Sequence, residues 1–285
     1  MKLFNDKTFY NKNYRGIELF LHILLPIVIY FVSTVIVTIG VPIVVILLYK
    51  RNISFENLVG DYGLLITLIS QILTLLILLL IYRKDIKTYP KVKKGLDLKI
   101  LLYGSLFVMA VGIISGYLMD FINYLFPSFG NGYGEIEKML TNSSFIAVFV
   151  STCVLAPIME EIMFRGIILN NLLSKRSTWY SILVSSLIFG LIHMNLLQGT
   201  NAFILGIALA IVFIKTRNIY ACMVGHFLNN LIATMATYTN FSGFVYDIIN
   251  IVLILICIYP ILVFTKTDNV KIEKNNLLEW FECLQ

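Results

Sequence analysis

The sequence predicts an all-α fold, a polytopic membrane helical bundle of about eight transmembrane helices. Of the 285 residues, 59% are hydrophobic and only 13% are charged, which is about half the charged fraction of an ordinary soluble domain. Apolar segments near or above the ~20 residues that a bilayer core requires recur along the whole chain. Lysine and arginine gather in alternate loops between these segments, as the positive-inside rule expects.

Eight apolar segments are expected to cross the membrane, and the sixth is the shortest. They are residues 20–49, 63–82, 98–125, 145–173, 178–197, 201–215, 219–239 and 246–265. No internal repeat or long polar insert separates them, so residues 1–285 are expected to form a single membrane domain. The loop between the third and fourth segments is rich in turn residues and then offers a short amphipathic helix at residues 135–140.

The distribution of positive charge predicts which side of the membrane each loop occupies. With the N-terminus in the cytoplasm, most of the 22 lysines and arginines fall on that side, and the outside loops hold only Lys50, Arg51 and Lys138. Both termini are therefore expected to be cytoplasmic. The basic loop at residues 83–94 is expected to lie against anionic lipid headgroups, and no nucleic acid partner is expected. The bias toward Ile, Asn, Lys and Tyr suggests a bacterial plasma membrane.

The fourth segment carries ionisable residues, which are costly in a membrane and point to function. Glu161 and Arg165 are four residues apart, so they share a helix face and are expected to pair. Glu160 is rotated by about 100° and lacks such a partner, so it must face a wet cavity, meet a partner on another helix or be protonated. Pro157 is expected to loosen the backbone hydrogen bonding near Glu160.

Two further segments each offer a polar face. The fifth carries Phe189 and His193, and the seventh carries His226 and Asn230, each pair at a spacing of four residues. Burying these faces separately against lipid would be costly, so the stable arrangement turns them toward the fourth segment. Small residues four apart, Gly112 with Gly116 and Gly206 with Ala210, are expected to let helix backbones approach closely.

A cluster of this composition has the parts of a hydrolase. A carboxylate beside an imidazole can deprotonate water, and an imidazole beside an amide can donate hydrogen bonds to the oxyanion that forms at an attacked carbonyl. Peptide bonds in membrane-anchored chains are abundant carbonyl substrates within reach. The residues therefore indicate hydrolysis of a membrane-associated peptide or protein.

The motifs Glu-Glu-x-x-x-Arg, Phe-x-x-x-His and His-x-x-x-Asn follow one another on separate segments, at residues 160–165, 189–193 and 226–230. In this order they resemble the CPBP (CAAX protease and bacteriocin-processing, or Abi) intramembrane endopeptidases, most strongly over residues 145–235. The resemblance implies that Glu160 and His193 activate a water molecule and that His226 and Asn230 stabilise the oxyanion. It also implies that Glu161 and Arg165 support the site, with Phe189 beside them.

A zinc-dependent mechanism is the alternative to a metal-free one. Members of the family are often labelled metalloproteases, and Glu160, His193 and His226 would form a His₂Glu set that leaves a fourth position for water. Asn230 favours the glutamate-type, metal-free mechanism, because an amide is a poor zinc ligand but a good oxyanion donor.

Other interpretations of the same residues remain open. The Glu161–Arg165 pair can serve purely as a structural staple, and His226 with Asn230 can hold helices together by hydrogen bonds. The whole chain can then be a non-catalytic interaction or bacteriocin-immunity protein of the same fold. A proton or small-molecule transporter would also use such groups, but it predicts inverted repeats that the sequence lacks. A separate set at the outer end of the fifth segment is expected to consist of solvated loop residues: Asn195, Gln198 and Asn201.

Overall fold

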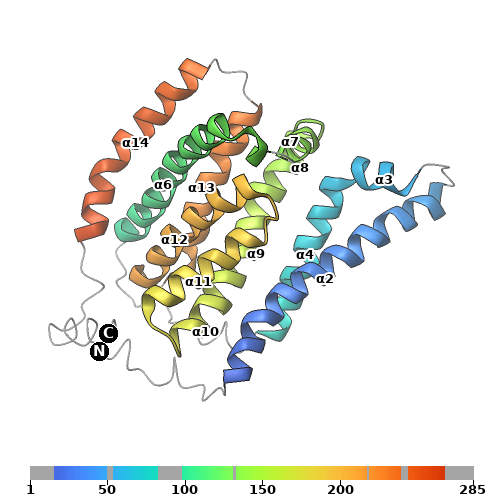
Figure 1. The fold of residues 1–285 in the computed structure, drawn as a ribbon, viewed down its shortest axis with the longest axis horizontal. Helices are drawn as coiled ribbons and strands as arrows, with labels where there is room; N and C mark the ends of the chain where they lie inside the picture. The colour runs from blue at the N-terminus through green and yellow to red at the C-terminus, as the bar shows by residue number, and fades with distance from the viewer. Residues whose placement is uncertain are drawn as a thin grey trace.

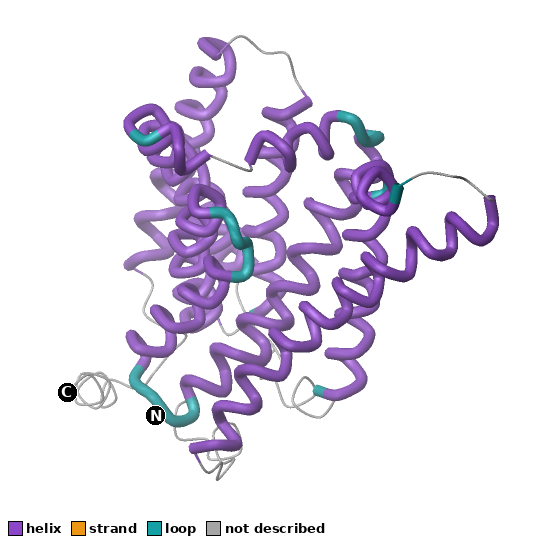
Figure 2. Tube along the Cα trace, turned by 45° about the vertical axis from the view of Figure 1, so that its right-hand side comes forward, coloured by secondary structure: helices purple, strands orange, loops and turns teal. Residues whose placement is uncertain are grey.

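The computed structural model describes residues 16–49, 54–82, 98–130, 133–216, 218–238 and 243–266. In these ranges the chain consists of helices joined by short loops and contains no strand (Figure 2). The predicted all-α membrane bundle is thus confirmed. The first half of the bundle is built from α2 (Gly16–Tyr49), α3 (Phe55–Asp61), α4 (Gly63–Ile81), α6 (Leu98–Leu125), the 3₁₀ turn η1 (Pro127–Gly130) and α7 (Tyr133–Thr141).

The second half carries the residues that the sequence singles out. The fourth segment is one rod made of α8 (Phe145–Val148), η2 (Phe149–Leu155), α9 (Ala156–Glu161), η3 (Ile162–Leu169) and α10 (Asn170–Leu173). It is followed by α11 (Thr178–Leu191), α12 (Leu196–Thr216), α13 (Ile219–Tyr238) and α14 (Gly243–Lys266). The start of α2 and the end of α14 lie toward the same end of the bundle (Figure 1).

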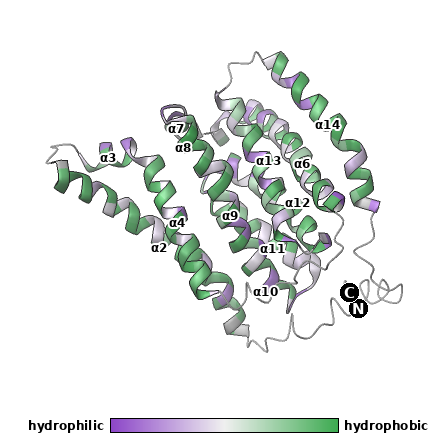
Figure 3. Cartoon of the chain, turned by 180° about the vertical axis from the view of Figure 1, so that it is seen from behind, coloured by the Kyte–Doolittle hydropathy of each residue, from purple (hydrophilic) through white to green (hydrophobic). Residues whose placement is uncertain are grey.

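Seven of the described helices are long and apolar enough to cross a membrane, and the eighth apolar helix, α11, is shorter. Large hydrophobic side chains cover the outside of the bundle, for example Phe20, Leu80 and Ile251, each more than half exposed. Figure 3 shows apolar residues along the length of α2, α4 and α14. Such a surface is stable only against lipid acyl chains, so the chain is an integral membrane protein embedded in the bilayer.

The prediction of which segment is short was wrong. The sixth segment forms the full-length helix α12, whereas the fifth ends at Leu191, six residues before its expected end. The chain turns there because Met194 takes a left-handed conformation with φ 52° and Asn195 caps α12. The Asn195 side-chain oxygen accepts from Gln198 N at 3.0 Å, and its backbone oxygen accepts from Gly199 N at 2.7 Å.

The fourth segment confirms that Pro157 loosens the backbone around Glu160. Both η2 and η3, on either side of α9, are π-helical turns, which are rare and mostly short insertions in α-helices. The N–H of Ala156 bonds to Ser151 O, five residues back, instead of Thr152 O, four residues back. Pro157 follows directly and has no N–H to donate.

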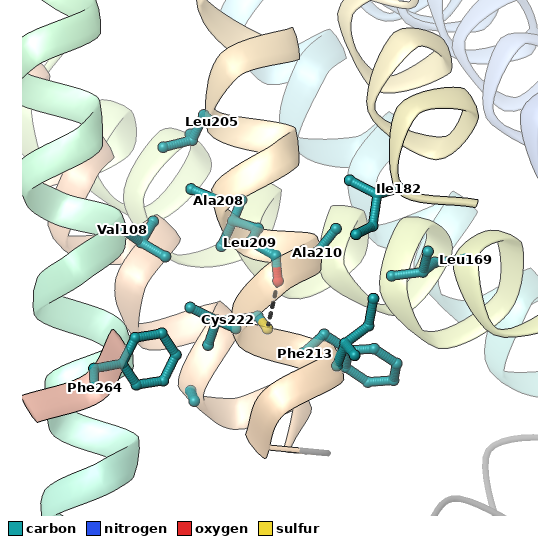
Figure 4. Close-up of a cluster of buried hydrophobic side chains, with 13 residues drawn as sticks. Val108, Leu169, Ile182, Leu205, Ala208, Leu209, Ala210, Phe213, Cys222 and Phe264 are labelled. Carbon is teal, nitrogen blue, oxygen red and sulfur yellow. Dashed lines mark hydrogen bonds between the residues drawn. The ribbon is translucent and has the colours of Figure 1, made fainter. Parts of the chain in front are cut away.

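Helices α6, α12, α13 and α14 share one apolar core, shown in Figure 4, around Val108, Leu209, Phe213 and Phe264. Close helix contacts surround it. A Cβ on Gly206 would lie 3.0 Å from Ser186 Cβ, and one on Gly112 would overlap Asn229, so both glycines permit the close approach that the sequence predicts. Gly116 does not, because nothing lies within 4 Å of its Cβ position.

Candidate active site

Glu161 and Arg165 form the predicted ion pair, and both side chains are completely buried. Arg165 Nη1 donates to Glu161 Oε1 at 3.0 Å, and Arg165 Nη2 donates to the backbone oxygen of Gly206 on α12 at 3.0 Å. The guanidinium carbon also lies 4.9 Å from the ring centroid of Phe189 on α11. A single arginine therefore ties the fourth segment to α11 and α12, and its charge is compensated by a carboxylate, a carbonyl and an aromatic face.

Glu161 also contacts His226 on α13, which sequence reasoning missed. Its Oε1 lies 2.9 Å from His226 Nδ1. An ionised carboxylate can only accept, so Nδ1 carries the proton and donates. The Nε2 atom of the same ring is thereby turned away from Glu161. Arg165 and Glu161 thus fix both the orientation of the imidazole and the position of its proton.

Glu160 meets its partner on another helix, one of the possibilities left open by the sequence. Its Oε2 lies 3.7 Å from His226 Nε2, and 14% of its side chain is exposed, against 0% for Glu161. At 3.7 Å the two atoms are near each other but beyond hydrogen-bonding distance. With protons on both nitrogens, His226 carries one positive charge, as does Arg165. These two charges balance those of the two glutamates, so that the buried cluster has no net charge.

The ring of Phe189 contacts two catalytic candidates, His193 in the turn after α11 and His226 on α13. His193 meets it edge-on with ring centroids 5.2 Å apart, and His226 does so at 5.8 Å. His193 Nδ1 lies 2.8 Å from the backbone oxygen of Phe189. A carbonyl oxygen only accepts, so Nδ1 donates and the lone pair of a neutral His193 is on Nε2, where it can act as a base.

Asn230 lies one turn from His226, but its amide is engaged with the fourth segment. Its Nδ2 donates to Thr152 O at 2.8 Å, and its Oδ1 accepts from Asn229 Nδ2 at 3.0 Å. Thr152 O does not accept from the Ala156 N–H, which bonds to Ser151 O, and Pro157 has no N–H to donate to it. One amide hydrogen of Asn230 thus satisfies a backbone group of η2, and the second hydrogen is left for another acceptor.

Six of the seven predicted site residues gather around Phe189 and Glu161, and Asn230 lies at the edge of this group. No hydrogen bond or ion pair joins Glu160 to His193 among the described residues. Sequence reasoning missed that Gly206 and Thr152 contact the site, because both do so through backbone oxygens, which leave no side-chain signal. It also missed Tyr30 of α2, which interacts electrostatically with Glu160. For Thr152 a signal did exist, because it precedes Pro157 by five residues, the spacing of a π turn.

The three residues of the alternative zinc set, Glu160, His193 and His226, are not arranged around one common point. Within the described part of the chain, no three His, Cys, Asp or Glu side chains are placed to hold one metal ion. Of the three side chains, Glu160 and His226 approach each other, with Oε2 and Nε2 3.7 Å apart. The donor arrangement therefore does not fit a preformed three-ligand zinc site.

Two residues of the set that was expected to be solvated loop lie inside a helix. Asn201 is not in a loop but within α12, where its Oδ1 accepts a hydrogen bond from Ser115 Oγ of α6. Gln198 is also inside α12, and Asn195 is the cap of that helix. The turn after α11 is short, so the polar side chains that follow it serve α12 and its contact with α6.

The comparisons with known proteins concern the same part of the chain. Residues 142–232 match the family model described as type II CAAX prenyl endopeptidase Rce1-like. Over 182 residues the chain is 28% identical to "Putative membrane peptidase YdiL" of Bacillus subtilis strain 168, an alignment that covers 61% of this chain and 72% of that protein. No solved structure matches the chain. The family match spans all three motifs of the site, so the chain is similar to CAAX-protease-like membrane proteins in the part that holds the candidate site.

Proposed function

We propose that this protein is an intramembrane endopeptidase that hydrolyses a peptide bond of a membrane-associated peptide or protein. The observation that carries the proposal is the pair Glu160 and His226, with Nε2 and Oε2 3.7 Å apart and His226 held from behind by Glu161 at 2.9 Å. Glu160 is the site carboxylate that keeps some exposure, and a general base must reach the water that it deprotonates.

In the proposed reaction Glu160, with His193, takes a proton from a water molecule whose oxygen attacks the scissile carbonyl carbon. The C–O bond forms as the carbonyl oxygen becomes an oxyanion. The C–N bond then breaks, and the proton held by Glu160 passes to the leaving amine. The lone pair of His193 on Nε2, assigned from its Nδ1 contact with Phe189 O at 2.8 Å, supports its part as a base.

His226 and Asn230 are proposed to stabilise the oxyanion. A His226 that donates from Nδ1 to Glu161 can donate from Nε2 as well only when it is protonated on both nitrogens. Its ring nitrogens lie 2.9 Å from a carboxylate oxygen of Glu161 and 3.7 Å from one of Glu160. The hydrogen of Asn230 that does not bond to Thr152 O is the second donor. No metal is required in this mechanism.

The setting that we propose is a bacterial plasma membrane with both termini in the cytoplasm. The positive-inside distribution supports this orientation, because Lys50, Arg51 and Lys138 alone would then lie outside. The relative from Bacillus subtilis supports a bacterial setting. A substrate that shares the bilayer reaches Glu160 without leaving the membrane.

The test compares the membrane peptides of cells that produce the wild-type chain with those of cells that produce Glu160→Gln at equal abundance. We expect specific cleavage products, detected by mass spectrometry, to be lost in the variant, since glutamine keeps the shape but cannot accept the proton of water. Asp120→Asn is the matched control, because it also replaces a carboxylate in a membrane span, on α6 and outside the site. Identical product patterns for wild type and Glu160→Gln would refute the protease proposal.

A further inference from the structure

Three residues outside the proposed proton transfers form a chain of contacts from α6 to the fourth segment. Gly112 of α6 faces Asn229 of α13 so closely that a Cβ on Gly112 would lie 1.8 Å from Asn229 Oδ1. Asn229 Nδ2 donates to Asn230 Oδ1 at 3.0 Å, and Asn230 Nδ2 donates to Thr152 O at 2.8 Å. The missing side chain of Gly112 is what leaves room for the Asn229 amide.

The last contact of this chain falls on a backbone group that the helix itself cannot satisfy. The residues four and five positions after Thr152 are the ones whose N–H could bond to Thr152 O in an α-helix or a π-helix. The N–H of Ala156 bonds to Ser151 O instead, and Pro157 has no N–H, so neither bonds to Thr152 O. A buried carbonyl without a partner costs ~1–3 kcal/mol. Asn230 supplies the partner, so the π-helical register of η2 is stable only while this amide stays in place.

The register of η2 matters because Glu160 lies in α9, directly after it. A π turn inserts one extra residue and so rotates everything that follows by about 100° relative to an uninterrupted α-helix. Glu160 and Glu161 are neighbours that differ by this same rotation. If η2 returned to an α-helical register, the faces presented by the two carboxylates toward His226 would change.

We propose that Gly112, Asn229 and Asn230 form a positioning relay that holds η2 in its π-helical register. This register sets the rotation of α9 and so keeps the face that carries Glu160 turned toward His226. The relay rests on the proposed function for its catalytic consequence. Gly112 and Asn229 are positioning residues, since they act on Glu160 only through Asn230 and Thr152 O, whereas Asn230 also has its proposed role at the oxyanion. The relay assigns α6, which carries none of the three sequence motifs, a part in setting the site.

The relay predicts a specific effect of Gly112→Ala. The three atoms nearest to the added methyl group all belong to the Asn229 side chain, so the amide can swing away while α6 and α13 remain packed. The variant should therefore fold, but Asn230 should lose its Asn229 contact. Gly116→Ala is the matched control, one turn further along α6, where nothing lies within 4 Å of the new Cβ.

The first measurement is hydrogen–deuterium exchange of the purified full chain in detergent, followed on peptides that cover residues 149–161. We expect exchange in this segment to be on the order of tenfold faster in Gly112→Ala and Asn229→Ala and unchanged in Gly116→Ala. The second measurement is turnover of the cleavage product that depends on Glu160. Here we expect kcat to fall on the order of tenfold to a hundredfold with little change in KM, because a misplaced base affects the chemical step more than binding.

A rescue experiment separates positioning from a direct role of these amides on the substrate. Pro157→Ala restores an N–H that can donate to Thr152 O, so it should suppress most of the exchange increase and of the kcat loss caused by Asn229→Ala. Equal exchange in Gly112→Ala and Gly116→Ala, or no suppression by Pro157→Ala, overturns the relay. If Gly112→Ala does not fold, the Asn229→Ala and Pro157→Ala pair decides. The exchange measurement needs no substrate, so it reports on the relay even if Glu160→Gln leaves all products in place.

Discussion

His226 donates from Nδ1 to Glu161 Oε1 over 2.9 Å, and this single contact sets the chemistry available at the other side of the ring. With its Nδ1 proton held by Glu161, the imidazole presents Nε2 toward Glu160. Glu161 itself is held by Arg165, whose second amino group reaches the Gly206 carbonyl. The adjacent glutamates therefore have separate tasks, one orienting the histidine and one facing it.

Glu161→Gln should destabilise the fold more than Glu160→Gln. Replacing Glu161 leaves the buried Arg165 charge without its counter-charge, and breaking a buried pair in this way costs about 3–5 kcal/mol. Glu160 is partly exposed and makes only a long contact, so its amide variant should retain most of the stability. Thermal unfolding of both purified variants in the same detergent measures the difference. Equal midpoints would show that Glu161 is not the structural member of the pair.

Phe189→Ala should lower stability by about 3–5 kcal/mol, the usual cost of removing a buried phenylalanine ring. The ring contacts Arg165 and both histidines, and its residue is 1% exposed. Phe121→Ala is the control, because that ring is 57% exposed on the outer surface of α6. We expect the two variants to differ clearly in unfolding temperature. Phe189→Leu should recover much of the stability but less of the turnover, since leucine lacks the aromatic face and edge.

Gly225→Ala should weaken the packing of α13 on α6. A Cβ there would lie 2.8 Å from Val108 Cβ and 3.2 Å from the Ser105 backbone, so the helices themselves must separate. The expected loss is ~1–3 kcal/mol, typical of overpacking. Gly40→Ala on α2 has open space at its Cβ position and should be neutral or slightly stabilising. Unfolding curves of the two variants check this, and a neutral Gly225→Ala would contradict the close α6–α13 contact.

Removal of metal should leave the activity intact if the reaction is of the glutamate type. The measurement is turnover of the Glu160-dependent product after treatment with a strong chelator, together with metal analysis of the purified protein. We expect full turnover and no stoichiometric zinc. Loss of turnover that zinc restores would overturn the metal-free mechanism and return Glu160, His193 and His226 to the role of ligands.

Much of the fold follows from local properties of the sequence. Length and hydropathy located all eight apolar helices, because lipid leaves only internal hydrogen bonding to a spanning segment. Length and hydropathy placed the end of the fifth helix too late. The helix ends at Leu191 because of the backbone conformation of Met194 and the cap at Asn195, and hydropathy does not detect either feature within an apolar stretch. Pro157 was a reliable local signal for the irregular backbone around Glu160.

The candidate site was predictable in its members but only partly in its contacts. The Glu161–Arg165 pair follows from a spacing of four residues on one helix and is present. The Glu161–His226 contact joins residues that are 65 positions apart, and the spacing on each helix does not say which of two adjacent glutamates faces α13. Asn230 was expected either to serve an oxyanion or to hold helices together, and its Nδ2 bond to Thr152 O is a contact of the second kind.

The sequence alone determined that this chain is a membrane-embedded helical bundle and which ionisable residues share each helix face, because hydropathy and the helical repeat act within one segment. Only the tertiary structure decided how these faces are rotated toward one another. That rotation depends on two π turns, on glycines that admit a neighbouring side chain, and on backbone oxygens of Gly206 and Thr152 that bind side chains from other parts of the chain. These are interactions between segments, and no pattern within a single segment encodes them.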